Sequence, residues 1–166
     1  MVKFKWLLGA AMGAALVCAN ASAQGLFGGQ DFTQRYPVWV NAGLLSYHAQ
    51  RDQGYRENNW GLGFETMFTR EHGMVAGTFI NSERARSRYI GYEWRPLNFA
   101  GGSDWNIGDG LTVNMIDGYP GTNNRGWFIA PLPFVSVEYK NIGVNFVAIP
   151  HKNGGAVAAQ VKLRVW

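Results

Sequence analysis

Cysteine is almost absent from this chain of 166 residues, which contains Cys18 alone. Lys3 and Lys5 precede an apolar run that ends at Cys18, and a small-residue cleavage site follows at 21–23. Because this is the layout of a secretory signal peptide, we expect residues 1–23 to be removed on export. The exported chain would then have no cysteine, which excludes disulfide bonds and argues against a zinc site.

Long apolar runs and a strong charge are also missing. Beyond residue 23 no segment is apolar over the roughly 20 residues that a transmembrane helix requires. Without Lys3 and Lys5, 13 of the 15 basic residues remain against 11 acidic ones, a balance too even for a nucleic-acid-binding protein. The histidines His48, His72 and His151 form no close-spaced cluster, and no phosphate-binding or nucleophile-elbow motif is present. We predict no metal, no cofactor and no nucleic-acid partner.

Short alternating segments are what the sequence does contain. In the last of them, Val161 and Leu163 alternate with Lys162 and Arg164. The 22 glycines and an aromatic content of 14% suit curved strands and interfacial aromatic girdles. Eight strands are predicted, at 38–48, 59–70, 74–82, 86–96, 107–117, 133–140, 143–149 and 156–166.

These strands predict an all-β fold, an eight-stranded antiparallel transmembrane β-barrel over 38–166, after a short N-terminal segment at 24–37. A barrel is the form in which strands can span a membrane, with apolar side chains toward lipid and polar ones inside. The inward Glu65, Glu93 and Glu138 then need buried partners, and Lys162 and Arg164 are the expected ones.

Connection lengths favour the membrane interpretation. With both ends of the barrel domain on the periplasmic side, the connections 49–58, 83–85, 118–132 and 151–155 are extracellular, and 71–73, 97–106 and 141–142 are periplasmic turns. The connection 97–106 is long for such a turn, and Trp166 falls on the opposite face from lipid-facing Val165. A soluble periplasmic barrel of the lipocalin type is the alternative.

Two strand ends carry residues that could support chemistry. His48 ends the first strand and Asn81-Ser82 end the third, and both strands run toward the extracellular rim. A histidine near a serine hydroxyl is the minimum set for general-base activation of an alcohol. The simpler interpretation of either residue is a polar side chain at a barrel rim.

A series of short segments runs in order through the chain: Tyr47-His48-Ala49, Tyr55 to Phe64 (YRENNWGLGF), Ile90 to Leu97 (IGYEWRPL), Pro131-Leu132-Pro133 with Ser136-Val137, and Ile149-Pro150 with Asn153-Gly154. In these segments the sequence resembles the lipid A palmitoyltransferase family (PagP). The resemblance implies a barrel in a Gram-negative outer membrane that moves a palmitoyl chain from a phospholipid to lipid A, without metal or cofactor. Its partners are then phospholipid and lipopolysaccharide, and we expect a monomer.

The resemblance also implies a catalytic set. His48 matches the family's histidine and Ser82 its serine, whereas Asn81 stands where the family has an aspartate. Asp52, in the loop after His48, could supply the missing carboxylate. The absence of the aspartate also favours a second hypothesis, a non-catalytic outer-membrane barrel that binds lipid or stabilises the membrane.

Further residues are candidates for substrate binding. Arg84, Arg86 and Arg88 follow Ser82 and are suited to lipopolysaccharide phosphates, or form a solvated loop. Pro131, Pro133 and Pro150 either mark strand ends beside loops or, as the resemblance implies, flank gaps that admit lipid chains laterally. The resemblance also implies that Gly91 is the nearest candidate for the inward glycine that measures acyl length.

Overall fold

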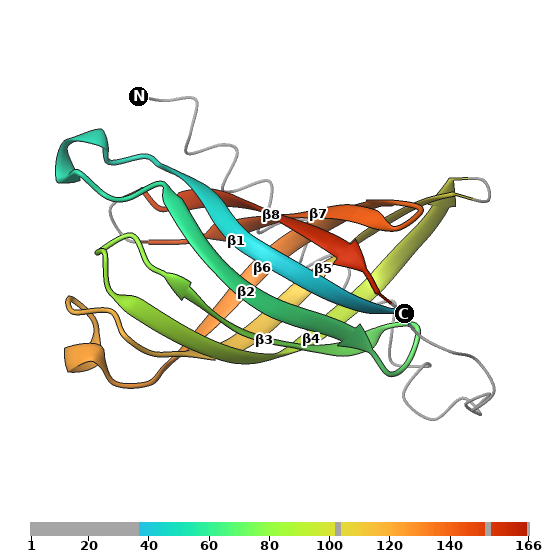
Figure 1. The fold of residues 1–166 in the computed structure, drawn as a ribbon, viewed down its shortest axis with the longest axis horizontal. Helices are drawn as coiled ribbons and strands as arrows, with labels where there is room; N and C mark the ends of the chain where they lie inside the picture. The colour runs from blue at the N-terminus through green and yellow to red at the C-terminus, as the bar shows by residue number, and fades with distance from the viewer. Residues whose placement is uncertain (1–36, 102–103, 152–153, 166) are drawn as a thin grey trace.

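The structure, a computed structural model, describes residues 37–101, 104–151 and 154–165. Eight antiparallel strands close into one barrel, in which β1 pairs with both β2 and β8 (Figure 1). The strands are β1 (Val38–His48), β2 (Asn58–Met67), β3 (His72–Ile80), β4 (Arg86–Gly101), β5 (Trp105–Ile116), β6 (Phe128–Tyr139), β7 (Ile142–Ile149) and β8 (Ala156–Arg164). The predicted all-β barrel is confirmed. The expected signal peptide, the expected N-terminal segment except Pro37, and Trp166 lie outside the described residues.

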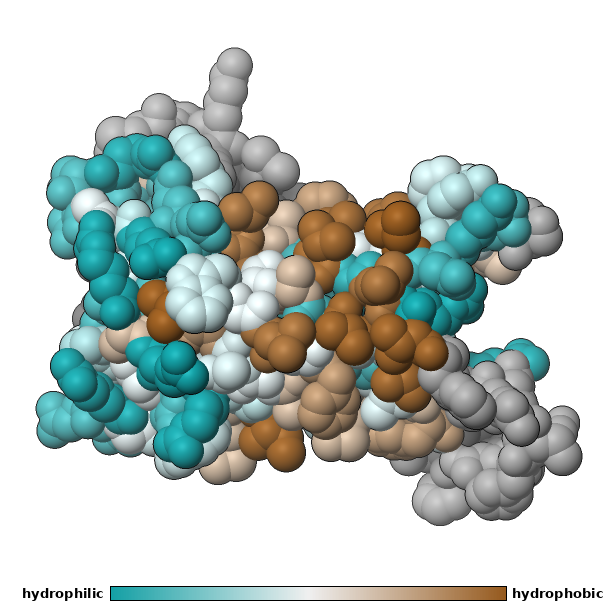
Figure 2. All heavy atoms as spheres, viewed as in Figure 1, coloured by the Kyte–Doolittle hydropathy of each residue, from teal (hydrophilic) through white to brown (hydrophobic). Residues whose placement is uncertain are grey.

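The barrel wall turns apolar side chains outward and polar side chains inward. On β8, Val161 and Leu163 are exposed, while Lys162 between them is buried. On β2, Leu62 and Phe64 are likewise exposed. Figure 2 shows hydrophobic residues across the middle of the wall and hydrophilic residues gathered at its left-hand end. An apolar outer band around a polar interior is the pattern of transmembrane barrels.

The two ends of the barrel differ in their connections. The long-loop end, on the left of Figure 1, is where β1 ends and β2 begins, and likewise for β3 and β4, β5 and β6, and β7 and β8; the short-turn end is where β2 meets β3, β4 meets β5 and β6 meets β7. Two short 3-10 helices, η1 (Arg51–Gln53) and η2 (Asn123–Arg125), belong to the long-loop end. In the part of the chain that the structure describes, no helix is long and apolar enough to cross a membrane.

The predicted connection 97–106 is wrong. β4 continues to Gly101 and β5 begins at Trp105, so that 102–104 alone joins them. Pro96 does not end β4, because the pairing register of β4 with β5 shifts between Trp94 and Leu97. An irregularity of this kind accommodates a residue that cannot donate a ladder hydrogen bond.

The predicted start of the sixth strand at 133 is also wrong. β6 begins at Phe128 and pairs with β5 along its whole length. Its recorded pairing with β7 begins only at Phe134, opposite Val147. Pro131 and Pro133 therefore lie where one side of β6 is not in the ladder, which is where a strand tolerates proline.

Buried charges fill the lumen near the short-turn end, and we call them the charged cluster: Glu65, Glu93, Arg95, Glu138 and Lys162. The Nζ of Lys162 lies 2.6 Å from Oε1 of Glu65 and 2.7 Å from Oε1 of Glu138. Arg95 contacts all three glutamates, with Nη1 at 2.9 Å from Oε1 of Glu138. Each buried carboxylate thus has a cationic partner, as buried charge requires.

The partners of these glutamates were predicted only in part. Lys162 is confirmed as a partner, whereas the prediction of Arg164 is wrong. Arg164 lies exposed at the end of β8, where its guanidinium donates to Oδ1 of Asn141 at 3.1 and 3.2 Å. Its place is taken by Arg95, which shares the inward face of β4 with Glu93. That shared face is the sequence signal that identifies Arg95.

Candidate active site

A cavity of about 430 Å³ occupies the lumen at the long-loop end. Apolar side chains form much of its wall, among them Leu44, Val75, Phe79, Leu132, Phe134 and Val147. Polar side chains line it near the loops and again toward the charged cluster, where Glu93, Asn114 and Asn145 lie. The interior of an eight-stranded barrel holds side chains or one small ligand. The cavity therefore suits a slender apolar chain with a polar group near the loops.

His48 enters this cavity because of an irregularity in β1. The register of β1 shifts between Ala42 and Leu44 against β2, and between Asn41 and Leu44 against β8. Beyond the shift Ser46 and His48 both line the cavity. The side chain of His48 is 13% exposed, and its ring centroid lies 4.9 Å from that of Tyr55. Its Nδ1 is buried and has no hydrogen-bond partner among the described residues.

Ser82 lines the same cavity from the loop that follows β3. It lies next to Tyr119, a cavity-lining residue of the β5–β6 loop. Burial raises the pKa of Tyr119 to about 12, so its phenol stays neutral at physiological pH and can donate a hydrogen bond. The structure thus brings His48 and Ser82 to one cavity. Tyr119 was not predicted, because it lies in a loop where alternation gives no signal.

Asn81 lies within the β3–β4 loop, and the residues that line the cavity do not include it. Its Nδ2 donates to Oγ of Ser87 and to the carbonyl of Gly118, both at 3.0 Å. Its Oδ1 accepts the backbone N–H groups of Glu83 and Ala85, both at 3.0 Å. Both ends of the amide are therefore engaged in holding the loop that carries the adjacent serine.

Glu57 is the carboxylate that the structure places beside His48. Its Oε1 lies 4.0 Å from Nδ1 of His48 and accepts the backbone N–H of His48 at 3.3 Å. A hydrogen bond from Arg51 holds the pKa of Glu57 below its usual value. Asp52, the substitute suggested by sequence, is exposed on η1 and accepts a hydrogen bond from Gln53 at 3.2 Å. Glu57 was not singled out, although it stands two residues before an inward position of β2.

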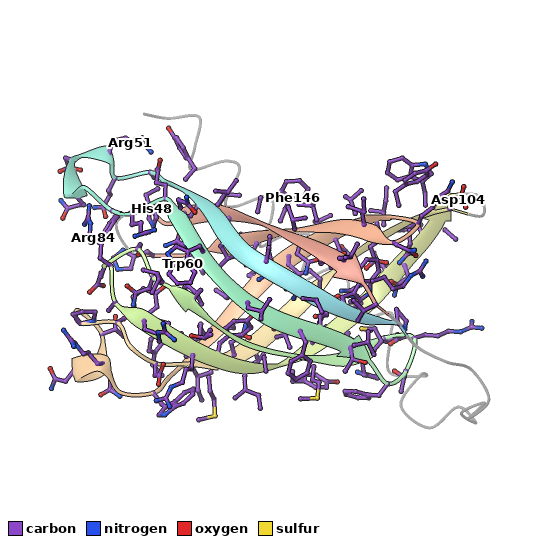
Figure 3. The ribbon with its side chains drawn as sticks, in the orientation of Figure 1. His48, Arg51, Trp60, Arg84, Asp104 and Phe146 are labelled. Carbon is purple, nitrogen blue, oxygen red and sulfur yellow. The ribbon has the colours of Figure 1, made fainter. Side chains whose placement is uncertain are left out.

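The three predicted arginines are exposed at the long-loop end. Arg84 donates to the backbone carbonyl of Gly54 at 3.0 Å, and Figure 3 shows Arg84 at the same end as His48. Arg86 and Arg88 flank the buried Ser87 on β4, so their side chains leave the barrel on its outer face. The Nε of Arg88 donates to Oδ2 of Asp117 at 2.8 Å. They form a basic outer rim beside the cavity rather than part of its lining.

The predicted prolines lie where β6 and β7 separate. Pro131 and Pro150 line the cavity, and Pro133 pairs with Leu111 of β5 one residue before the recorded β6–β7 ladder begins. The wall beside the cavity therefore lacks part of its ladder.

Gly91 is buried in β4, and a side chain there would collide with Oδ1 of Asn114. Asn114 and Glu93 line the deep part of the cavity, whereas Gly91 is not among the lining residues.

The arrangement supplies a base, a hydroxyl and a neutral phenol at the loop end of a mainly apolar cavity. Such a set can transfer protons to and from an alcohol or an ester held there. Among the described residues, no group of three or more His, Cys, Asp or Glu side chains could hold a metal ion.

Comparison with known proteins finds a family model that matches this chain and a curated relative that is similar to it. The model is described as "Antimicrobial peptide resistance and lipid A acylation protein PagP", and it matches residues 32–161. The relative is named lipid A acyltransferase PagP, from Laribacter hongkongensis (strain HLHK9), and is 29% identical over 128 residues. That alignment covers 72% of this chain and 59% of the relative, so the chain spans less than two thirds of its length.

Proposed function

The chain belongs to the PagP family of lipid A acylation proteins, and on that premise we propose that it transfers an acyl chain from a phospholipid to lipid A in a bacterial outer membrane. The observation that carries the proposal is the shared cavity of His48 and Ser82, whose mainly apolar wall suits an acyl chain. Palmitoyl is the chain that we propose, and a monomer is the proposed form.

In the proposed reaction His48 is the general base. It accepts the proton of a lipid A hydroxyl, whose oxygen attacks the ester carbonyl carbon of the phospholipid. The tetrahedral intermediate then collapses, and the bond to the glycerol oxygen breaks as that oxygen takes the proton from His48. Ser82 and Tyr119, both able to donate, assist by hydrogen-bonding the reacting oxygens. Asn81 keeps Ser82 in place through the loop.

Substrate access follows from the remaining features. We propose that the donor chain enters between β6 and β7, beside Pro131 and Pro150, where the recorded ladder stops short of the long-loop end. Exposed Arg84, Arg86 and Arg88 bind phosphate groups of lipid A at the rim. Pro133 helps to keep the gap unpaired, and Gly91 leaves room for Asn114 beneath the chain.

The test is acyl transfer by the protein in detergent micelles, with dipalmitoyl phosphatidylcholine as donor and lipid A as acceptor, followed by mass spectrometry of lipid A. We expect a mass increase of one palmitoyl group with the wild type. His48→Ala should lower kcat by roughly 10²- to 10⁴-fold, the usual contribution of a general base. Unchanged rates in His48→Ala and Ser82→Ala would overturn the mechanism, and no product with the wild type would overturn the function.

A non-catalytic lipid-binding barrel is the second candidate, favoured by Asn81 in place of the family's aspartate. It predicts that lipid A remains unmodified in the same assay while the barrel still retains bound phospholipid after extraction. Recovery of the protein in the soluble periplasm instead would exclude both candidates and favour a soluble carrier.

A further inference from the structure

The proposed general base lacks an evident anionic partner at the position that the family resemblance indicates. An imidazole that accepts a proton becomes a cation, and a carboxylate beside it orients the ring and stabilises that cation. Asn81 carries no charge, and its amide is held by Ser87, Gly118 and two backbone N–H groups. Asp52 is exposed on η1. Neither residue is among the groups that shift the pKa of His48 or form an ion pair with it in the described part of the chain.

We propose that Glu57 is the positioning carboxylate of the site, accepting the Nδ1–H of His48 so that Nε2 faces the reacting hydroxyl. This inference rests on the proposed function. It deepens that function by naming Glu57 as the residue that supplies the negative charge beside the general base.

Strand pairing is the first observation that carries the proposal. The Oγ of Ser46 donates to Oδ1 of Asn59 at 2.7 Å across β1 and β2, inside the barrel. His48 lies two residues after Ser46, and Glu57 lies two residues before Asn59, just ahead of β2. The alternation of side chains therefore puts His48 and Glu57 on the same side as the Ser46–Asn59 pair. The backbone N–H of Ser46 donates to the carbonyl of Glu57 at 2.8 Å, which anchors Glu57 opposite the end of β1.

The unpaired ring nitrogen is the second observation. The Nδ1 of His48 is buried without a hydrogen-bond partner among the described residues, and a buried polar atom of this kind costs free energy until it is paired. Oε1 of Glu57 lies 4.0 Å away, about 1 Å beyond a normal hydrogen bond. Catalytic hydrogen bonds are often long in ligand-free enzymes and shorten when the substrate binds. The side chain of Glu57 is 37% exposed, which leaves it room for the movement of about 1 Å that the proposed hydrogen bond requires.

The charge of Glu57 is the third observation. Hydrogen bonds from Arg51 and from the backbone of His48 lower the pKa of Glu57, so the side chain is a carboxylate at neutral pH. It can therefore accept the Nδ1–H and offset the positive charge that develops on the ring. The other titratable or charged side chains that act on the ring, contact it, or line the cavity at this end come from all four long loops: Arg51, Tyr55, Glu83, Tyr119 and His151.

The experiment compares Glu57→Gln with Asp52→Asn, which removes the same charge from the same loop. Glutamine keeps the shape of Glu57 and can still accept hydrogen bonds, so its effect isolates the charge. We expect kcat to fall on the order of 10²-fold with KM little changed; this is less than the ~10⁴-fold for the buried aspartate of a Ser-His-Asp triad, because Glu57 is partly exposed. Asp52→Asn should stay within about twofold of wild type, as exposed charges contribute little. Glu57→Asp, which keeps a carboxylate, should retain more activity than Glu57→Gln.

The pH profile supplies a readout that loss of structure would not produce. A neighbouring carboxylate favours the protonated imidazole, so removing it should move the lower limb of the kcat profile to lower pH by about one unit. An unchanged limb and rate in Glu57→Gln, or an equal effect of Asp52→Asn, would overturn the proposal.

A measurement without turnover separates this inference from the proposed function. In ¹⁵N NMR spectra of the protein in micelles at neutral pH, the neutral ring of His48 should carry its hydrogen on Nδ1 in the wild type, and should shift toward the Nε2–H tautomer in Glu57→Ala. Identical tautomer populations in the two proteins would refute the pairing even if acyl transfer is observed. A wild type that transfers nothing but shows the tautomer shift would refute the proposed function and leave the pairing standing.

Discussion

The lumen of the barrel is filled in opposite ways at its two ends. Near the short-turn end, the charged cluster fills it with hydrogen-bonded carboxylates and cations, such as Lys162 at 2.6 Å from Glu65. Near the long-loop end, the same strands surround a cavity of about 430 Å³ with a mainly apolar wall. β6 contributes to both regions. Phe134 lines the cavity, and Glu138, four residues further along the same face of the strand, belongs to the charged cluster.

This difference separates the side chains that stabilise the barrel from the region in which we propose that the reaction takes place. Buried charges stabilise a fold only while every partner is present, and removing one leaves the others unpaired in a low-dielectric interior. An apolar cavity places no such demand on its walls. Substitutions in the charged cluster should therefore change stability, and substitutions of residues that line the cavity should change activity.

Lys162→Met should produce the largest effect on stability. It leaves Glu65 and Glu138 without their shared ammonium, and we expect the free energy of unfolding to fall by about 3 kcal/mol, the low end for a broken buried pair because Arg95 still contacts both glutamates. Urea unfolding of the protein in lipid vesicles, followed by tryptophan fluorescence, measures this. Arg164→Met is the matched control, because Arg164 lies two residues along β8 but is exposed. A similar loss in both variants would contradict the distinction between the cluster and the rim.

Most of the fold could be predicted from the sequence because alternation is a local signal. The bounds of β1 were predicted without error, and those of β7 to within one residue. The ends of β4 and β6 were not, since Pro96 and Pro131 look like strand breaks unless the register shift and the partial ladder are known.

The site could be predicted from the sequence less completely than the fold. His48 and Ser82 could be assigned to one rim from strand direction alone. Glu57 and Tyr119 could not, because their positions depend on the β1 irregularity and on the paths of two long loops. Arg164 was predicted as a partner of the buried glutamates because it shares the parity of Lys162, and alternation does not show that it lies exposed at the end of β8.

Asn81→Asp should lower the free energy of unfolding by a smaller amount. It should also fail to raise the transfer rate, whereas the family resemblance alone would predict a gain. A carboxylate cannot donate to Ser87 and to the carbonyl of Gly118, so we expect a loss of about 2 kcal/mol and no gain in transfer rate. Urea unfolding and the lipid A assay measure the two quantities. Asn124→Asp, an exposed change in η2, serves as the control for added charge. A rise in rate with Asn81→Asp would mean that this position takes part in the reaction after all.

Ala158→Leu should have the smallest effect on stability and should act mainly on which donor is accepted. Ala158 is buried and lines the cavity, so the larger side chain occupies space that we propose for the acyl chain. Because this space is not filled by protein, the free energy of unfolding should change by less than about 1 kcal/mol. The rate with a palmitoyl donor should fall roughly tenfold, the loss expected for about 1.4 kcal/mol of transition-state binding, and shorter donors should lose less.

Ala159→Leu is the control, since Ala159 lies on the other face of β8 and does not line the cavity. Competing phosphatidylcholines of different chain length, with the products separated by mass, give the preference directly. An unchanged chain-length preference in Ala158→Leu would show that the acyl chain does not enter the cavity. The difference between the two ends of the lumen would then concern side-chain packing and not substrate binding.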